Sequence, residues 1–242
     1  MTVSSQGTYK NLIEMLDNSR KRYAERPLFG TKRDGNYEWT TYEQFAEKVD
    51  DLRGGLASLG ISSGDKVAII SKNTEEWAVS AYATYGLCGQ HIPMYETQLA
   101  KEWEYIVRDC SAKVLLVSNP IVLEQTLDFP ERIDSLEHVV LISGSSSKEV
   151  KTYDDLLKTG RENPVEAQQP ESGFPMGMIY TSGTTGDPKG VILSHRNIIF
   201  ECQAVLPLLG MTENDRSLAF LPWAHVFGQV AEVHGLLNSG GS

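Results

Sequence analysis

Glycine, hydroxyl and lysine residues are concentrated between Tyr180 and Gly190, as expected of a loop that binds phosphate groups. Glycines let backbone N–H groups approach a ligand closely, hydroxyl groups donate hydrogen bonds, and the ammonium group of Lys189 supplies positive charge. The same residue types are common in polar surface turns, so their composition alone leaves that alternative open. The residues predicted to contact a phosphate chain are Thr181, Ser182, Gly183, Thr184, Thr185, Gly186 and Lys189.

The residues on both sides of this loop indicate that it joins two strands. In the common nucleotide-binding loop, a Lys-Ser or Lys-Thr pair opens directly into a helix. Here a glycine follows the lysine, and the β-branched run 191–193 comes next, which favours a strand. We therefore expect strands at 176–180 and 190–193, followed by a helix at 196–209 with Ser194 as its N-cap.

A second stretch of interest follows an expected strand at 215–221. It reads Leu-Pro-Trp-Ala-His-Val-Phe-Gly-Gln from Leu221 to Gln229. Ligand sites in open α/β sheets lie beyond the carboxyl ends of strands, so a site is expected here. The histidines outside this stretch have no motif around them and are expected to be structural: His91, His138, His195 and His234.

Upstream of the loop, short apolar strands alternate with helices, which predicts an α/β fold. Such alternation indicates a mainly parallel sheet flanked by helices. The expected strands are 28–32, 36–40, 66–71, 91–95, 113–118 and 138–143. The expected helices are 9–16, the segment between Thr41 and Gly60, and 75–87, 99–109, 120–127 and 153–158.

Two of these helices carry capping signals. Thr41 and Gln44 form a capping box, and Gly60 ends the helix that they begin. Asn73, with Glu76 at the third position, is expected to cap the helix at 75–87. The aromatic residues of that helix are expected to pack in the core: Trp77, Tyr82 and Tyr85.

The N-terminal helix admits two interpretations. Its apolar positions within 9–16 follow helical spacing, and basic residues follow at 20–22. The preferred interpretation is a helix that docks on the core. A basic amphipathic helix also suits a membrane surface, so peripheral membrane contact stays open.

The composition excludes several classes of protein. At 242 residues, 40% hydrophobic and 22% charged, the chain is typical of a globular protein. It contains no run of 18 apolar residues, the length that a membrane-spanning helix needs. A net charge of −10 argues against a nucleic-acid partner, because phosphate backbones are bound by clustered lysine and arginine. Three widely spaced cysteines suggest neither a disulfide framework nor a zinc site, so we expect a cytoplasmic protein.

The chain divides into three parts on pattern and composition. Residues 1–143 are expected to form a first α/β subdomain with N-terminal helices. Residues 144–173 are rich in serine, proline and charge, and are expected to be a connector. Residues 174–242 then begin a nucleotide-binding subdomain that carries the loop.

The two motifs resemble those of a known family. The run from Tyr180 to Gly190 resembles the phosphate-binding motif of the adenylate-forming superfamily, which includes acyl-CoA synthetases, luciferases and peptide-synthetase adenylation domains. The second stretch is similar to the Leu-Pro-x-x-His-x-x-Gly segment of its acyl-activating branch. Trp223 and Gln229 look most like long-chain fatty acyl-CoA synthetases. The resemblance implies a partial N-terminal domain of the acyl-CoA synthetase type.

The resemblance also implies a reaction. ATP and a fatty acid would give an acyl-adenylate and pyrophosphate, and the thiol of coenzyme A would then attack the adenylate. His225 would lie near the adenylate and the acyl carboxyl group; the alternative is a buried histidine satisfied by the backbone. Trp223 and Phe227 would contact the substrate, and Thr184 would contact Mg²⁺ bound to ATP.

Other parts of the superfamily pattern are not found in this sequence. The adenine-binding segment, the glutamate for Mg²⁺, the ribose-binding aspartate and the C-terminal domain with its lysine all follow the histidine segment in that family. We therefore expect this chain to be inactive alone. A non-catalytic binding or scaffold fragment of the same fold is the alternative. An amino-acid-activating domain is disfavoured, because 218–231 holds no carboxylate to pair with an ammonium group.

Overall fold

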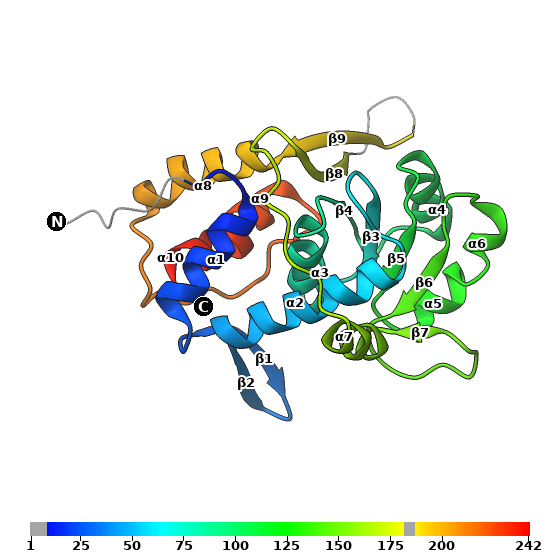
Figure 1. Ribbon diagram of the computed structural model, residues 1–242, viewed down its shortest axis with the longest axis horizontal. Coiled ribbons are helices and arrows are strands. Elements are labelled where there is room, and N and C mark those ends of the chain that lie inside the picture. Colours follow the sequence, from blue (N-terminus) through cyan, green and yellow to red (C-terminus); the bar gives the residue numbers. More distant parts are fainter. Residues whose placement is uncertain (1–8, 182–186) are drawn as a thin grey trace.

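A seven-stranded sheet organises the computed structural model, which describes residues 9–181 and 187–242 (Figure 1). The strand order is β7-β6-β5-β3-β4-β8-β9; all neighbours are parallel except β8 and β9, which are antiparallel. The prediction of an α/β fold with a mainly parallel sheet is confirmed. The strands are β3 (Lys66–Ile70), β4 (Gln90–Met94), β5 (Val114–Val117), β6 (His138–Leu141), β7 (Lys151–Thr152), β8 (Pro175–Thr181) and β9 (Lys189–Ser194).

Helices cover both faces of this sheet. Successive residues of a strand point to opposite faces, and in β3 Val67 and Ile69 join one buried cluster while Ala68 and Ile70 join the other. The first cluster lies under α1 (Leu12–Tyr23), α2 (Tyr42–Ser58), α3 (Glu75–Tyr85), α7 (Tyr153–Glu162), α8 (His195–Leu209) and the C-terminal helices. The second lies under α4 (Ala100–Asp109), α5 (Pro120–Thr126) and α6 (Phe129–Arg132). Both faces of the central strands are therefore buried, which explains their nearly continuous apolar sequences.

The capping predictions are confirmed at two helices and wrong at one. Thr41 and Gln44 form the expected capping box on α2, and Ser194 caps α8. The N-cap of α3 is Thr74, whose hydroxyl accepts a hydrogen bond from the N–H of Trp77. Asn73 does not cap α3, because its side-chain amide hydrogen-bonds to a distant segment of the chain.

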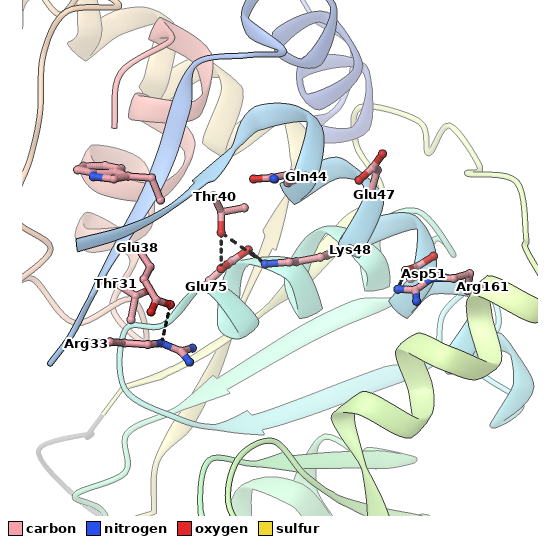
Figure 2. Close-up of a pocket in the computed structure, with 11 residues that line it drawn as sticks. Thr31, Arg33, Glu38, Thr40, Gln44, Glu47, Lys48, Asp51, Glu75 and Arg161 are labelled. Atoms are coloured by element: carbon pink, nitrogen blue, oxygen red, sulfur yellow. Dashed lines mark hydrogen bonds and ion pairs between the residues drawn. The ribbon is translucent and has the colours of Figure 1, made fainter. Parts of the chain in front are cut away.

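An antiparallel hairpin stands beside the main sheet. It consists of β1 (Pro27–Arg33) and β2 (Asn36–Thr41), and it turns at Asp34 and Gly35, both of which have positive φ. Figure 2 shows how it is fixed to the helices: the Thr40 hydroxyl donates to a Glu75 carboxylate oxygen 2.9 Å away, and Lys48 Nζ lies 2.6 Å from the other oxygen. The hairpin is thus tied to α2 and α3.

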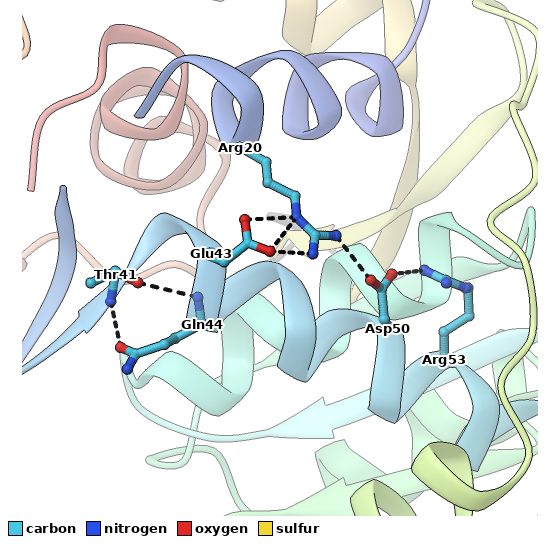
Figure 3. A network of polar contacts seen from close by, with 6 residues as sticks. All are labelled: Arg20, Thr41, Glu43, Gln44, Asp50 and Arg53. Atoms are coloured by element: carbon cyan, nitrogen blue, oxygen red, sulfur yellow. Dashed lines mark hydrogen bonds and ion pairs between the residues drawn. The ribbon is translucent and has the colours of Figure 1, made fainter. Parts of the chain in front are cut away.

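The N-terminal helix docks on the core, as preferred from the sequence. Its apolar face, including Leu12 and Leu16, is buried. Figure 3 shows Arg20 on α1 hydrogen-bonded to Glu43 and 3.1 Å from a carboxylate oxygen of Asp50, both on α2. The apolar face of α1 is therefore occupied by the protein interior. Within the described part of the chain, no helix combines the length and hydropathy needed to cross a bilayer.

The serine- and proline-rich segment after β6 is more ordered than its composition suggests. β7 adds a parallel edge strand to β6, and α7 extends to Glu162, beyond the expected end at residue 158. A Cβ on Gly160 would overlap the backbone oxygen of Asp51, so α7 packs on α2 with its backbone in close contact.

The predicted strand at 215–221 is wrong. These residues belong to neither sheet, and Leu218 and Phe220 are each 74% exposed. The N–H groups of Phe220 and Leu221 donate to the Glu232 carboxylate instead of to a neighbouring strand. Alternating apolar residues alone could not reveal this side-chain acceptor.

Three histidines of the expected structural set meet in the core around two tyrosines. His234 Nδ1 lies 2.8 Å from the Tyr82 hydroxyl, and His91 Nε2 lies 3.0 Å from a serine hydroxyl. The ring centroids of Tyr85 and His195 are 5.5 Å apart. Burial lowers the pKa of His91 and of His234 to about 3, and that of His195 to about 4. These imidazoles are therefore neutral in the folded protein near pH 7.

This cluster predicts a loss of stability in acid. The unfolded histidines, with a pKa near 6.5, take up protons that the folded ones do not, so stability is fully present above that value and falls as the pH drops from there toward about 3. The free energy of unfolding should fall by about 1.4 kcal/mol per pH unit for each histidine. Urea unfolding of the wild type and His195→Gln at about pH 7, 6 and 5 measures this. Equal slopes for the two proteins would contradict it.

A second prediction concerns the junction of β4 and β8. Gly177 pairs with His91, and a Cβ on Gly177 would overlap the backbone oxygen of His91. Gly177→Ala should therefore push the strands apart and destabilise the protein by on the order of 3 kcal/mol. The urea midpoint measures the loss. Gly173→Ala is the matched control, because nothing lies within 4 Å of its added Cβ; similar midpoints for both variants would refute the packing argument.

Candidate active site

The segment predicted to bind phosphate lies between β8 and β9 in the sequence. Thr181 ends β8 and pairs in register with Lys189, the first residue of β9. The prediction that the loop joins two strands is confirmed. The other residues predicted to contact phosphate lie outside the described residues: Ser182, Gly183, Thr184, Thr185 and Gly186.

The base of this hairpin is fixed to α4. The Tyr180 hydroxyl donates a 2.6 Å hydrogen bond to a carboxylate oxygen of Asp109. Burial, together with this hydrogen bond, raises the pKa of Tyr180, so the phenol stays protonated. A Cβ on Gly190 would lie 3.0 Å from the Tyr180 ring, so the hairpin backbone lies close against that ring. The two strand ends that begin and finish the loop therefore have a rigid support.

Lys189 is an exposed cation at the start of β9. Its side chain is exposed, and none of the salt bridges among residues 9–181 and 187–242 involves it. Lysine at such a position acts as a point charge for an anion.

His225 is exposed at the start of a short helix, which excludes the alternative of a buried histidine. It is the N-cap of α9 (Val226–Gly228), and its Nδ1 accepts a 3.2 Å hydrogen bond from the N–H of Phe227. Because Nδ1 accepts, the neutral imidazole carries its proton on Nε2. His225 therefore offers an Nε2–H donor to a ligand.

The two aromatic residues expected to contact substrate differ in exposure. Phe227 is 58% exposed. Trp223 is 4% exposed, and its ring packs against Trp77 and Phe29 with centroids 5.6 and 6.0 Å away. Its indole Nε1–H donates a 3.0 Å hydrogen bond to Glu232. Phe227 is accessible to a substrate, whereas Trp223 mainly links the histidine segment to the core.

Sequence reasoning missed two polar residues that hold this segment. Asn73 hydrogen-bonds to the backbone of Leu221 and of Trp223. Glu232 lies in the π-helix η1 (Gln229–His234), one position beyond the carboxylate-free window 218–231. A wider window would have found Glu232, whereas no local signal distinguishes Asn73 from a helix cap.

A pocket of about 770 Å³ lies at the carboxyl ends of β3, β5 and β6. Ser71, Ser118 and Ser143 line it near the strand ends, and Trp223 and Glu232 also line it. This is the edge of an open α/β sheet at which ligands bind. Thr181, Lys189 and His225 are not among its lining residues, so these three described residues lie outside this pocket.

A smaller pocket of about 410 Å³ lies between the hairpin, α2 and α7 (Figure 2). Its cations are paired with carboxylates: Lys48 with Glu75 at 2.6 Å, Arg161 with Asp51 at 2.6 Å and Arg33 with Glu38 at 3.3 Å. Cations that are already paired are poor ligands for a further anion, so this pocket is an unfavourable phosphate site.

The described residues offer no dedicated metal site. Within residues 9–181 and 187–242, no three histidine, cysteine, aspartate or glutamate side chains are grouped so that they could hold a metal ion. Thr184, the predicted contact of Mg²⁺ bound to ATP, lies outside them.

Comparison with known proteins identifies relatives that cover nearly the whole chain. Fatty acyl-CoA synthetase B from Dictyostelium discoideum is 30% identical over 237 residues, which is 90% of this chain and 35% of that protein. Long chain acyl-CoA synthetase 4 from Arabidopsis thaliana is 28% identical over 88% of this chain and 35% of that protein. The chain thus spans about a third of the length of these relatives.

Solved structures share the fold. The anthranilate CoA ligase AuaEII, in complex with anthranoyl-AMP, aligns with a TM-score of 0.87 and 26% identity over 100% of this chain and 46% of that one. A long-chain-fatty-acid-CoA ligase, FadD1 from Archaeoglobus fulgidus, aligns with a TM-score of 0.82 and 21% identity over 98% of this chain and 47% of that one. At 21% identity, the similarity to FadD1 shows only that the fold is shared.

The family model described as AMP-binding enzyme matches residues 16–242. This match and the named relatives confirm the resemblance to the adenylate-forming superfamily. The chain belongs to the AMP-binding enzyme family.

Proposed function

We propose that the protein containing this chain activates a long-chain fatty acid in two steps. The carboxylate attacks the α-phosphate of ATP to form an acyl-adenylate and pyrophosphate, and the thiol of coenzyme A then displaces AMP to form the thioester. The observation that carries this proposal is the exposed, unbridged Lys189 beside a glycine- and hydroxyl-rich loop, in a chain whose relatives are fatty acyl-CoA synthetases.

Lys189 and the loop would hold the polyphosphate. Attack of a carboxylate on a phosphate brings like charges together, so positioned donors and a cation are needed to neutralise the phosphate oxygens. Lys189 begins β9 directly opposite Thr181. The ammonium group and the loop donors would therefore act on one ligand as a set.

His225 would serve as a hydrogen-bond donor to the reacting groups. Its Nδ1 is engaged by a backbone N–H, which leaves Nε2–H to stabilise negative charge on a carboxylate or phosphate oxygen. Mg²⁺ would supply further charge neutralisation when it arrives with ATP, since it commonly binds through phosphates and few protein ligands.

The surroundings of His225 favour an acid without a charged tail. Phe227 gives exposed apolar surface beside the imidazole. The nearest carboxylate in sequence, Glu232, already accepts hydrogen bonds from Phe220, Leu221 and Trp223. An amino-acid ammonium group would compete with these donors. A scaffold role without chemistry is the alternative, and pyrophosphate release separates the two.

Lys189→Ala in the full-length protein should weaken ATP binding by roughly 10- to 100-fold, because a charge-assisted hydrogen bond is lost. Calorimetric titration of ATP and the rate of pyrophosphate release measure the effect. Lys158→Ala removes an exposed lysine from α7 and is the matched control. If both variants bind ATP and release pyrophosphate like the wild type, Lys189 is not a phosphate ligand.

Pyrophosphate release should depend on long-chain fatty acids rather than on amino acids, for the apolar and charge reasons given above. The assay compares saturated fatty acids of several lengths with leucine, phenylalanine and aspartate in the full-length protein. A preference for any amino acid would overturn the substrate class, and no release with any acid would favour the scaffold alternative.

A further inference from the structure

We infer that Asn73 is a positioning residue for His225, acting through the backbone between Leu221 and Trp223. The inference rests on the proposed role of His225 in adenylation. It assigns a function to a residue that lies about 150 positions away in the sequence and contacts no reacting atom.

Asn73 binds the histidine segment with both ends of its amide. Its Nδ2 donates to the carbonyl oxygen of Leu221 at 2.8 Å, and its Oδ1 accepts from the N–H of Trp223 at 2.9 Å. This pair of bonds imitates the contact between two strands and fixes the backbone on both sides of Pro222. Asn73 itself lies three residues beyond Ile70, in the connection that leads from the carboxyl end of β3 to α3.

Glu232 holds the same segment through further hydrogen bonds. Its Oε1 accepts from the N–H groups of Phe220 and Leu221 at 3.4 and 3.3 Å, and its Oε2 accepts from the Trp223 indole at 3.0 Å. Gln229 adds a 2.8 Å hydrogen bond from its amide to the carbonyl oxygen of Trp223. Glu232 and Gln229 belong to η1, a π-helix, and such helices are frequent at functional sites.

A short turn connects the backbone that Asn73 holds to His225. The N–H of His225 donates to the carbonyl oxygen of Pro222 at 3.0 Å, so the backbone held by Asn73 is the acceptor that orients His225. The His225 side chain then caps α9. Hydrogen bonds and the short stretch of backbone between them thus connect Asn73 to His225.

Loss of this support should affect the reaction step rather than ATP binding. A misplacement of about 1 Å costs about 100-fold in rate. In the full-length protein, Asn73→Ala should therefore lower kcat roughly 10- to 100-fold and leave KM for ATP within about twofold of the wild type. Asn73→Asp keeps the acceptor for Trp223 and loses the donor to Leu221, so its loss should be smaller. A large rise in KM for ATP with unchanged kcat would refute the inference.

A double-mutant cycle separates positioning from general structural damage. If Asn73 acts through His225, Asn73→Ala should lower the rate much less in a His225→Ala background than in the wild type. Additive effects would show that Asn73 acts elsewhere. Asn163→Ala is the matched control, because it also removes an amide-to-carbonyl hydrogen bond, at the end of α7; its kcat should equal that of the wild type.

A spectroscopic measurement keeps the inference testable apart from activity. With ¹³Cε1-labelled histidine in the full-length protein, the His225 signal is identified by its loss in His225→Gln. This signal should shift in Asn73→Ala and in Glu232→Gln but not in Asn163→Ala. An unshifted signal in both segment variants would overturn the inference. If the wild type activates no acid, the proposed function fails, while this signal still decides whether Asn73 positions His225.

Discussion

The close approach of β8 to β4 is the contact on which the arrangement of the site depends. β8 joins the parallel sheet at one backbone pair, Gly177 with His91, where a side chain on Gly177 would collide with the β4 backbone. Beyond Gly177, β8 continues to Thr181 as the first strand of the β8–β9 hairpin. The absence of one Cβ therefore sets how closely the β8–β9 hairpin approaches the central strands. Tyr180, bonded to Asp109, fixes the hairpin's orientation at the other end.

Several cations of the described residues are paired with carboxylates, whereas Lys189 is not. The chain carries a net charge of −10, yet cations near the smaller pocket are paired with carboxylates (Figure 2), and Arg20 is taken by Glu43 and Asp50 (Figure 3). Lys189 differs from these because no described carboxylate bridges it. An anionic ligand at Lys189 would therefore have to be attracted by local charge, against the sign of the overall field.

Local patterns predicted most of the fold, and long-range contacts account for the failures. Apolar runs located β3 to β6, and side chains within three residues located the caps at Thr41 and Ser194. The strand expected at 215–221 failed because Glu232, outside that segment, takes its N–H groups. Asn73 resembled a cap, but its partner Trp223 is far along the chain. In the candidate site, Lys189 and His225 are exposed and their roles stay predictions, whereas no periodicity in the sequence indicates the burial of Trp223.

Trp223 connects the segment from Leu221 to Gln229, which contains His225, to the protein interior. Its ring packs on Trp77 and Phe29, while its backbone and indole N–H are bonded to Gln229 and Glu232. Interiors are close-packed and transmit strain, so a change in side-chain volume at Trp77 displaces the ring and, through it, the backbone that leads to His225. Substitutions in this aromatic core would accordingly alter the position of His225 without touching the residue itself.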